Sequence, residues 1–502
     1  MKTPSSHLFD LIKSLDKSEK RYFRIFSTKE VNNESTLFIK LYDLIEKQAE
    51  SNDIYNEDEI KKHLAGSKLL KQFPFYKNYL YNILLQSLRH YHASTSTDAF
   101  LKNKIQEINI LYDKGLFAQC DSLIKETRKV ADKYDKKLIL LELFEWDALV
   151  KNAISDTKGL NEYIDKGHAE QLELLELEKN YIQLTKFVYQ TSNDAQINAG
   201  RNIPTLFTLD DLDKVYAKIE KSDRNNFMPK FYYNLTKASY YLFTGKLERD
   251  HEFLKKNFEH IGHQKHISIE MPHLTFFSIF NYALACSFIE KYDDSMEVIE
   301  LLRKKPNPYF KKRSKYLEAN IFTYTYGLEL QLRITHENFA GSNELESVIK
   351  AGIHEHSYVI NTANKLVLFS LMAIILFAEK KYKQALNWIN EVINFEDDVI
   401  RLDIHCNARI MNMMLHYELG NYDYLKNLYR STVRYLKKNG SFGTLEKKLL
   451  DFISNDLPSM EKENKSAAFK KLQAELTPLM TDKNARLVLY YKNINTWLKN
   501  NH

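Results

Sequence analysis

The chain has 502 residues, of which only 13 are glycine and 9 are proline. Together these two residue types make well under half of their usual share of about 12%, so the chain lacks the turn residues that β-sandwiches and β-barrels need. Its 72 basic and 66 acidic side chains leave a formal charge of +6, which as a total indicates only a soluble protein. We therefore expect an almost entirely helical fold.

The cysteines and the apolar runs indicate a cytoplasmic protein. Cys120, Cys286 and Cys406 are odd in number, far apart and set among apolar residues, which fits neither a disulfide framework nor a metal site. The N-terminal residues lead into an amphipathic helix, with no apolar export core. The longest uncharged apolar run, 366–378, is about 13 residues long and too short to span a bilayer. We expect no contact with a membrane.

Residues 1–98 are predicted to form an N-terminal helical module. Helices are expected at 7–26, with a break near Leu15 and Asp16, at 36–50, at 57–64 and, after the turn at Gly66, at 75–92. Between residues 60 and 97 the chain carries basic residues and no acidic one, and a short helix, a glycine turn and a longer helix resemble a helix-turn-helix in outline. However, the 75–92 helix has Tyr76 and Leu80 at core spacing, which favours a structural role over nucleic-acid contact.

From Leu101 onwards the chain repeats a helical hairpin. The clearest copy is 365–395: no charged residue occurs between Leu366 and Ala378, a polar turn follows at 379–382, and apolar residues then recur at helical spacing. Two helices joined by so short a turn should lie antiparallel and still leave apolar surface exposed, so each hairpin needs neighbours.

A bulky residue after each turn sets the length of the repeat. These residues are Phe117, Leu247, Tyr292, Tyr382 and Tyr422, and they are 130, 45, 90 and 40 residues apart. The gaps correspond to about three, one, two and one units of roughly 40 to 45 residues, which is the length of one helix pair in a repeat array. We predict stacked helix pairs over residues 99–440.

The hairpins resemble those of the tetratricopeptide family, in which a small residue on each helix lets the two pack closely. Ala373 with Ala385 matches this pattern best, and Ala283 with Ser295 is next. The chain departs from the family in its longer period and in having Cys120, Asp250 and Leu425 at the second small position. The resemblance implies an all-α, right-handed α-solenoid of antiparallel helix pairs. We expect the N-terminal module and a helical segment at 441–502, with a last amphipathic helix at 484–499, to cap it.

The resemblance also implies a concave face lined by the first helix of each pair, and such an apolar, aromatic face suits an amphipathic helix or an apolar peptide. The alternative is that these residues are ordinary core, with the C-terminal helix around Trp497 lying against them. The candidate residues are Tyr232, Leu235, Leu242, Phe277, Phe280, Leu284, Ile374, Phe377, Met414 and Tyr417.

Two basic clusters could bind phosphates, although solvated loops and helix C-termini explain such clusters more simply. The first cluster, around two prolines, contains Arg303, Lys304, Lys305, Lys311, Lys312 and Arg313. The second, on a helix that ends at Gly440, contains Lys426, Arg430, Arg434, Lys437 and Lys438.

The sequence shows no chemistry of an enzyme. It has no phosphate-binding glycine loop, no nucleophile elbow and no nucleophile with a placed base. His260, His263 and His266 are three residues apart in an expected loop, whereas metal-binding histidines on one helix are usually four apart. We therefore predict a non-catalytic scaffold or adaptor without cofactor or metal, which binds another protein whose identity the sequence does not reveal. The alternative is a regulator that contacts nucleic acid through its N-terminal module and basic loops.

Overall fold

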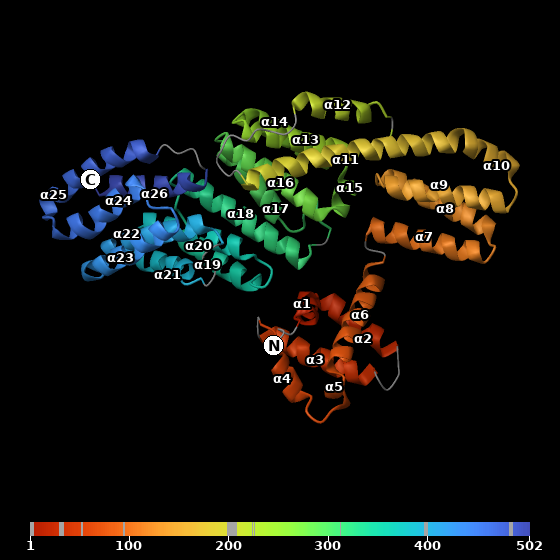
Figure 1. The fold of residues 1–502 in the computed structure, drawn as a ribbon, viewed down its shortest axis with the longest axis horizontal. Coiled ribbons are helices and arrows are strands. Elements are labelled where there is room, and N and C mark those ends of the chain that lie inside the picture. The colour runs from red at the N-terminus through yellow and green to blue at the C-terminus, as the bar shows by residue number, and fades with distance from the viewer. Residues whose placement is uncertain are drawn as a thin grey trace. The chain divides into compact units, whose positions relative to one another are not determined.

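The structure is a computed structural model that describes residues 5–29, 35–51, 54–93, 96–197, 208–222, 224, 226–311, 313–395, 400–480 and 485–501. In these ranges the protein is helical and has no β-strand, and a single isolated bridge joins Asn307 and Phe310 (Figure 1). Helices that follow one another along the chain pack together in pairs. The predicted all-helical fold is confirmed, and the packing is that of a protein built from helix pairs. None of the helices in the described ranges is both long and apolar enough to cross a membrane.

The chain folds into two compact units. The first contains residues 1–183 and 215–229, and the second contains residues 184–214 and 230–502. Two helices, α11 (His168–Ile197) and α12 (Leu209–Glu220), contribute residues to both. The domain boundaries expected at residues 98 and 440 remain predictions.

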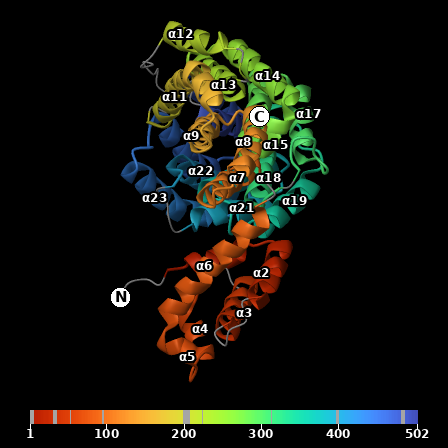
Figure 2. The ribbon, with the colours of Figure 1, turned by 90° about the vertical axis from the view of Figure 1, so that its right-hand side faces the viewer.

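The first unit begins with six helices around one apolar core. In this group α2, α3 and α6 lie side by side (Figure 2). Tyr76 and Leu80 of α6 are buried, as the core interpretation of this helix expects. The break predicted near Asp16 is a helix start, because the Asp16 carboxylate accepts the Glu19 amide at 2.8 Å while the Glu19 carboxylate accepts the Asp16 amide. The six helices are α1 (His7–Ser14), α2 (Lys17–Lys29), α3 (Ser35–Ser51), α4 (Glu57–His63), α5 (Lys68–Lys71) and α6 (Phe73–His92).

A second core in the same unit forms beneath the next helices, with Leu143 and Cys120 among its buried residues. A π-helical turn at 163–167 leads into the long helix α11. The helices that precede it are α7 (Thr97–Asp113), α8 (Phe117–Lys133), α9 (Lys137–Ala153) and α10 (Thr157–Glu162).

The second unit is a succession of helix pairs followed by a C-terminal group. Helix α20 is apolar on all sides, and α18, α21, α22 and α26 all contact it, as expected of a helix that is buried around its whole circumference. The helices are α13 (Phe227–Phe243), α14 (Leu247–His263), α15 (Lys265–Glu270), α16 (Pro272–Phe288), α17 (Tyr292–Arg303), α18 (Lys315–Thr335), α19 (Ser342–Glu355), α20 (Thr362–Ala378), α21 (Tyr382–Ile393), α22 (Leu402–Glu418), α23 (Tyr422–Lys438), α24 (Thr444–Asp451), α25 (Lys462–Leu476) and α26 (Ala485–Asn500).

The predicted hairpins share one turn geometry. The five bulky residues that set the repeat length, Phe117, Leu247, Tyr292, Tyr382 and Tyr422, each begin a helix. The residue two positions before each of them has a positive φ: Gly115, Gly245, Glu290, Lys380 and Gly420. In all five turns the residue between these two positions donates its backbone N–H to the carbonyl five residues earlier, at 2.8–3.0 Å. This is the C-terminal cap in which a left-handed residue ends one helix, so the five hairpins turn in the same way.

The positions expected to hold small residues are buried in every copy. Ala373 and Ala385 are both inaccessible to solvent, and so are Ala283 and Ser295, which are also twelve residues apart. The Ser295 hydroxyl donates to the Ala283 carbonyl at 2.8 Å, so the small residues do allow close approach of the two backbones. Leu425 is buried at the equivalent place, which shows that the position tolerates size.

Three local expectations have specific outcomes. The sequence also predicts a capping box of Thr208 with Asp211, with Phe207 as an apolar partner. Hydrogen bonds in both directions confirm the pairing, while Phe207 lies outside the described residues. The loop expected around His260 is wrong, because α14 extends to His263 and α15 starts at Lys265. The sequence pattern further predicts a helix over 342–362, but α19 ends at Glu355 instead.

Candidate functional site

The predicted binding face is partly open on α16. Phe277 and Leu284 are half-buried, Phe280 is buried, and Phe288 is 37% exposed on the same side of the helix. Tyr324 of α18 completes the surface, because its ring lies 5.4 Å from that of Phe277 and 5.3 Å from that of Phe280. We call these five residues the α16 stripe. The α13 candidates Tyr232, Leu235 and Leu242 are half-buried.

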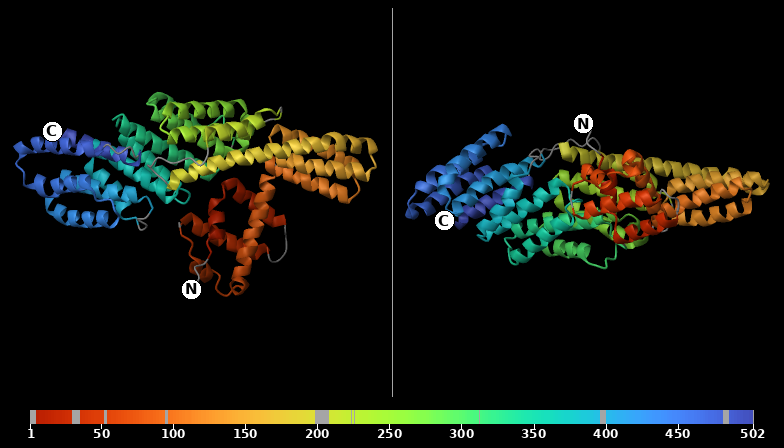
Figure 3. Two further views of the ribbon diagram at one scale, coloured as in Figure 1. Left: turned by 45° about the horizontal axis from the view of Figure 1, so that its top comes forward. Right: turned by 90° about the horizontal axis from the view of Figure 1, so that it is seen from below.

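The same face is closed farther along the chain. Ile374, Phe377, Met414 and Tyr417 are all buried core residues. The C-terminal helix α26 lies beside α18 and α20, and its return towards these helices is visible in blue in the left view of Figure 3. In this half of the unit the candidates are therefore core beneath the chain's own helix.

Trp497 anchors α26. Its indole N–H donates to the Glu418 carboxylate at 2.6 Å, and its ring meets the rings of Tyr417 at 6.2 Å and Phe469 at 5.2 Å, edge to face. A small cavity of about 240 Å³ remains between α26, Phe377 and Glu418. The sequence indicated this arrangement through the amphipathic pattern of the last helix, but not the contact with Glu418.

Burial makes the phenols near this contact still harder to ionise. Desolvation raises the pKa of Tyr417 to about 12. Burial, followed by the nearby Glu418 charge, also raises the pKa of Tyr382. Both side chains are therefore neutral at physiological pH, which suits an apolar helix interface.

The described residues of the first basic cluster have different environments. The Arg303 guanidinium lies 3.7 Å from the centre of the Tyr326 ring and donates to the Glu329 carboxylate at 2.7 Å. Arg313 donates to the backbone carbonyls of residues 302 and 304, and burial lowers its pKa. Both arginines therefore support the loop from the inside.

The lysines of that cluster are on the outside. Lys304, Lys305 and Lys311 are exposed, and Lys305 pairs with Glu318 at 2.5 Å. Lys312 lies outside the described residues. The structure therefore does not gather the five described side chains into one cationic surface.

The second basic cluster, on α23, is exposed, and two of its members lie beside an arginine from another helix. Arg434 and Lys438 line a cavity together with Arg409 of α22. Sequence reasoning missed Arg409, although it stands out as a single cation in the middle of an apolar helix.

The described residues contain no group of three histidine, cysteine or carboxylate side chains placed to hold a metal ion. The three cysteines are free thiols, and burial raises the pKa of each. Such thiols are poor nucleophiles at neutral pH.

Comparison with known proteins adds no relative: no family model, no curated protein and no solved structure matches this chain. Its function must therefore be inferred from the packing described above.

Proposed function

We propose that this chain is a non-catalytic, cytoplasmic scaffold of the tetratricopeptide-like, right-handed solenoid type, which binds an amphipathic helix of another protein on the α16 stripe. The observation that carries the proposal is the position of α26. On α22 the corresponding first-helix face, at Tyr417, is covered by an amphipathic helix of the same chain through Trp497. A surface of the same kind that is left half-exposed on α16 suits a helix supplied by a partner.

Ring contacts support a repeat arrangement of α16 and α18. His273 meets Tyr316 at 5.1 Å, and Phe280 meets Tyr324 at 5.3 Å. From the first contact to the second, the residue number increases in both α16 and α18, so the two helices run in the same direction. The first helices of successive pairs in a solenoid are oriented in this way. Tyr324 thereby extends the stripe onto the next pair.

The size of the stripe matches a short helix. Phe277 and Phe288 are eleven residues apart, which corresponds to roughly 16 Å along a helix axis. A partner helix of about three turns would cover that length. Each large apolar side chain that becomes fully buried contributes roughly 1.5 to 3 kcal/mol before the cost of association, so a few anchors suffice for a measurable complex.

The test is a selection followed by affinity measurements. A displayed library of amphipathic helical peptides is selected on the intact protein, and the affinities of the enriched peptides are measured by fluorescence anisotropy. The double variant Phe277→Ala with Tyr324→Ala should weaken binding by roughly tenfold or more, as expected for about 1.4 kcal/mol or more of lost contact. Tyr424→Ala removes an exposed ring from α23 and serves as the control.

Equal binding by the wild type and the double variant would refute the assignment of the site, and failure to enrich any helical peptide would refute the function. The nucleic-acid alternative loses two of its cations in the N-terminal module, because Lys61 and Lys77 both pair with Glu57.

A further inference from the structure

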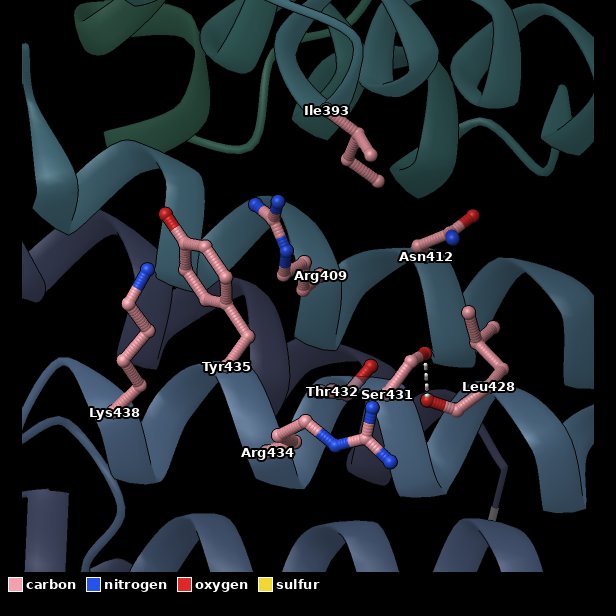
Figure 4. A pocket seen from close by; sticks show the side chains of 9 residues that line it. All are labelled: Ile393, Arg409, Asn412, Leu428, Ser431, Thr432, Arg434, Tyr435 and Lys438. Atoms are coloured by element: carbon pink, nitrogen blue, oxygen red, sulfur yellow. Dashed lines mark hydrogen bonds between the residues drawn. The ribbon is translucent and has the colours of Figure 1, made fainter. Parts of the chain in front are cut away.

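A second, separate site lies between α22 and α23, in a cavity of about 360 Å³ (Figure 4). This volume is at the small end of the range of about 300–1,000 Å³ for small-molecule pockets. Arg409 enters the cavity wall from α22, and Arg434 and Lys438 come from α23, one turn apart. The rest of the wall combines the aliphatic side chains of Ile393 and Leu428 and the ring of Tyr435 with three polar side chains, those of Asn412, Ser431 and Thr432.

No carboxylate of the described residues compensates the three cations. Among the described residues the lining contains no carboxylate, and none of the three side chains forms an ion pair there. By contrast, Arg401, just before the start of α22, pairs with Asp403 at 2.7 Å. Cations placed together without a carboxylate repel one another, and an anion between them would remove that repulsion.

Arg409 is held in place without losing its capacity to donate. Its guanidinium lies 3.5 Å from the centre of the Tyr435 ring, and one N–H donates to the His405 carbonyl at 3.2 Å. A guanidinium has five N–H donors, so most of them remain for a ligand. Stacking on a ring lowers the entropy that the side chain loses on binding.

The cavity also contains buried polar atoms that have no partner. The Thr432 hydroxyl, in a residue 1% exposed, and the side-chain oxygen of Asn412, 7% exposed, have no hydrogen bond. The oxygen and nitrogen of an amide are assigned from the surrounding hydrogen bonds, so this end of Asn412 is equally able to donate. Buried groups of this kind usually point to a ligand or a water.

Among the buried threonines of the described helices, only Thr432 has a hydroxyl without a hydrogen bond, and Thr275 donates to the Ser268 carbonyl at 2.8 Å. Thr127, Thr236, Thr323 and Thr325 each donate to the carbonyl four residues back at 2.6–2.8 Å. Thr432 does not, and the carbonyl four residues before it instead accepts the Ser431 hydroxyl at 2.9 Å, as the dashed line in Figure 4 shows. Its hydroxyl is therefore left without an acceptor inside the protein.

We propose that this cavity binds a small organic phosphate monoester. The doubly charged phosphate group would lie against Arg409, Arg434 and Lys438 and accept the Thr432 hydroxyl, and the organic part would contact Tyr435 and the aliphatic wall. A phosphate matches three cations and several donors better than a carboxylate, which a single arginine can satisfy.

The experiment titrates the full chain with phenyl phosphate, benzoate and inorganic phosphate by calorimetry at physiological salt. Phenyl phosphate should bind saturably with a Kd of about 1 mM or below and at least tenfold more tightly than benzoate. Absence of saturable binding, or equal binding of benzoate, would overturn the proposal. An oligonucleotide that binds more tightly than phenyl phosphate would also overturn it, because the ligand would then be a nucleic acid.

Two variants and one control locate the site. Thr432→Val keeps the shape and removes the hydroxyl, so it should weaken phenyl phosphate binding while raising the thermal midpoint of the free protein, because an unsatisfied buried hydroxyl is lost. The pair Arg434→Ala with Lys438→Ala should weaken binding by tenfold or more. The pair Arg430→Ala with Lys437→Ala removes the same charge from exposed positions of α23 outside the lining and should leave binding within about twofold. If both double variants lose the same binding affinity for phenyl phosphate, the ligand is attracted only by the general positive charge of α23, and the assignment of the site to this cavity is refuted.

Discussion

Removal of the Trp497 side chain should release α26 from the helices beneath it. Trp497 is only 3% exposed, contacts the rings of Tyr417 and Phe469, and donates to the Glu418 carboxylate. Replacing a buried tryptophan by alanine typically costs about 3–5 kcal/mol. A hydrogen bond to a charged group accounts for roughly 1.5–3 kcal/mol of such a loss. Trp497→Phe, which keeps a ring and loses the N–H, should therefore fall between the wild type and Trp497→Ala.

Hydrogen exchange of the intact protein measures this loss directly. Since every 1.36 kcal/mol is a factor of ten, amides of residues 485–501 should lose protection by roughly 100-fold to 1,000-fold or more in Trp497→Ala. Peptides from α1 to α6, in the other unit, should not change. Lys499→Ala, on the exposed side of the same helix, is the matched control. If protection of α26 in Trp497→Ala stays within about threefold of the wild type, the helix is not held by this anchor.

Three further changes test the packing and the charges, each by thermal unfolding. A Cβ at Gly352 would lie 2.1 Å from the Phe322 ring, so Gly352→Ala should destabilise the folded protein by about 1–3 kcal/mol despite the gain in helix propensity. This loss should disappear in a protein that also carries Phe322→Leu. A loss of stability that persists in the double variant would contradict the clash. Burial raises the pKa of Asp250 to about 7, above its unfolded value of about 4, so the wild type should lose stability as pH rises between these values. Asp250→Asn should then be more stable than the wild type at pH 8, by at most about 4 kcal/mol, but not at pH 4; an equal difference at both pH values would refute this. Glu329 is 5% exposed and pairs with two arginines at 2.7 and 2.8 Å. Glu329→Gln should therefore destabilise the folded protein by about 3–5 kcal/mol. An unchanged thermal midpoint would show that the arginines find other partners.

Local structure was largely predictable because its causes are local. The cap at Asp16 and the hydrogen bonds between Thr208 and Asp211 involve residues three positions apart, so their pattern is visible in the sequence. The mistake at His260 has the opposite origin: the closely spaced histidines and Gly262 suggested a loop, yet α14 continues through them. Burial of Ile261 against the rest of the unit outweighs the low helix propensity of one glycine.

The amino-acid sequence by itself determined that this protein is helical, that its helices come in pairs with a common turn, and which face of each helix is apolar. Those properties follow from the spacing of side chains along one helix and from the residues at its ends. The tertiary structure alone decided which apolar face meets which. Only there does Tyr324 join Phe277, and only there does Arg409 line a cavity with α23. Many helix faces in this chain are equally apolar, so their partners depend on how the helices stack and on which faces α26 covers.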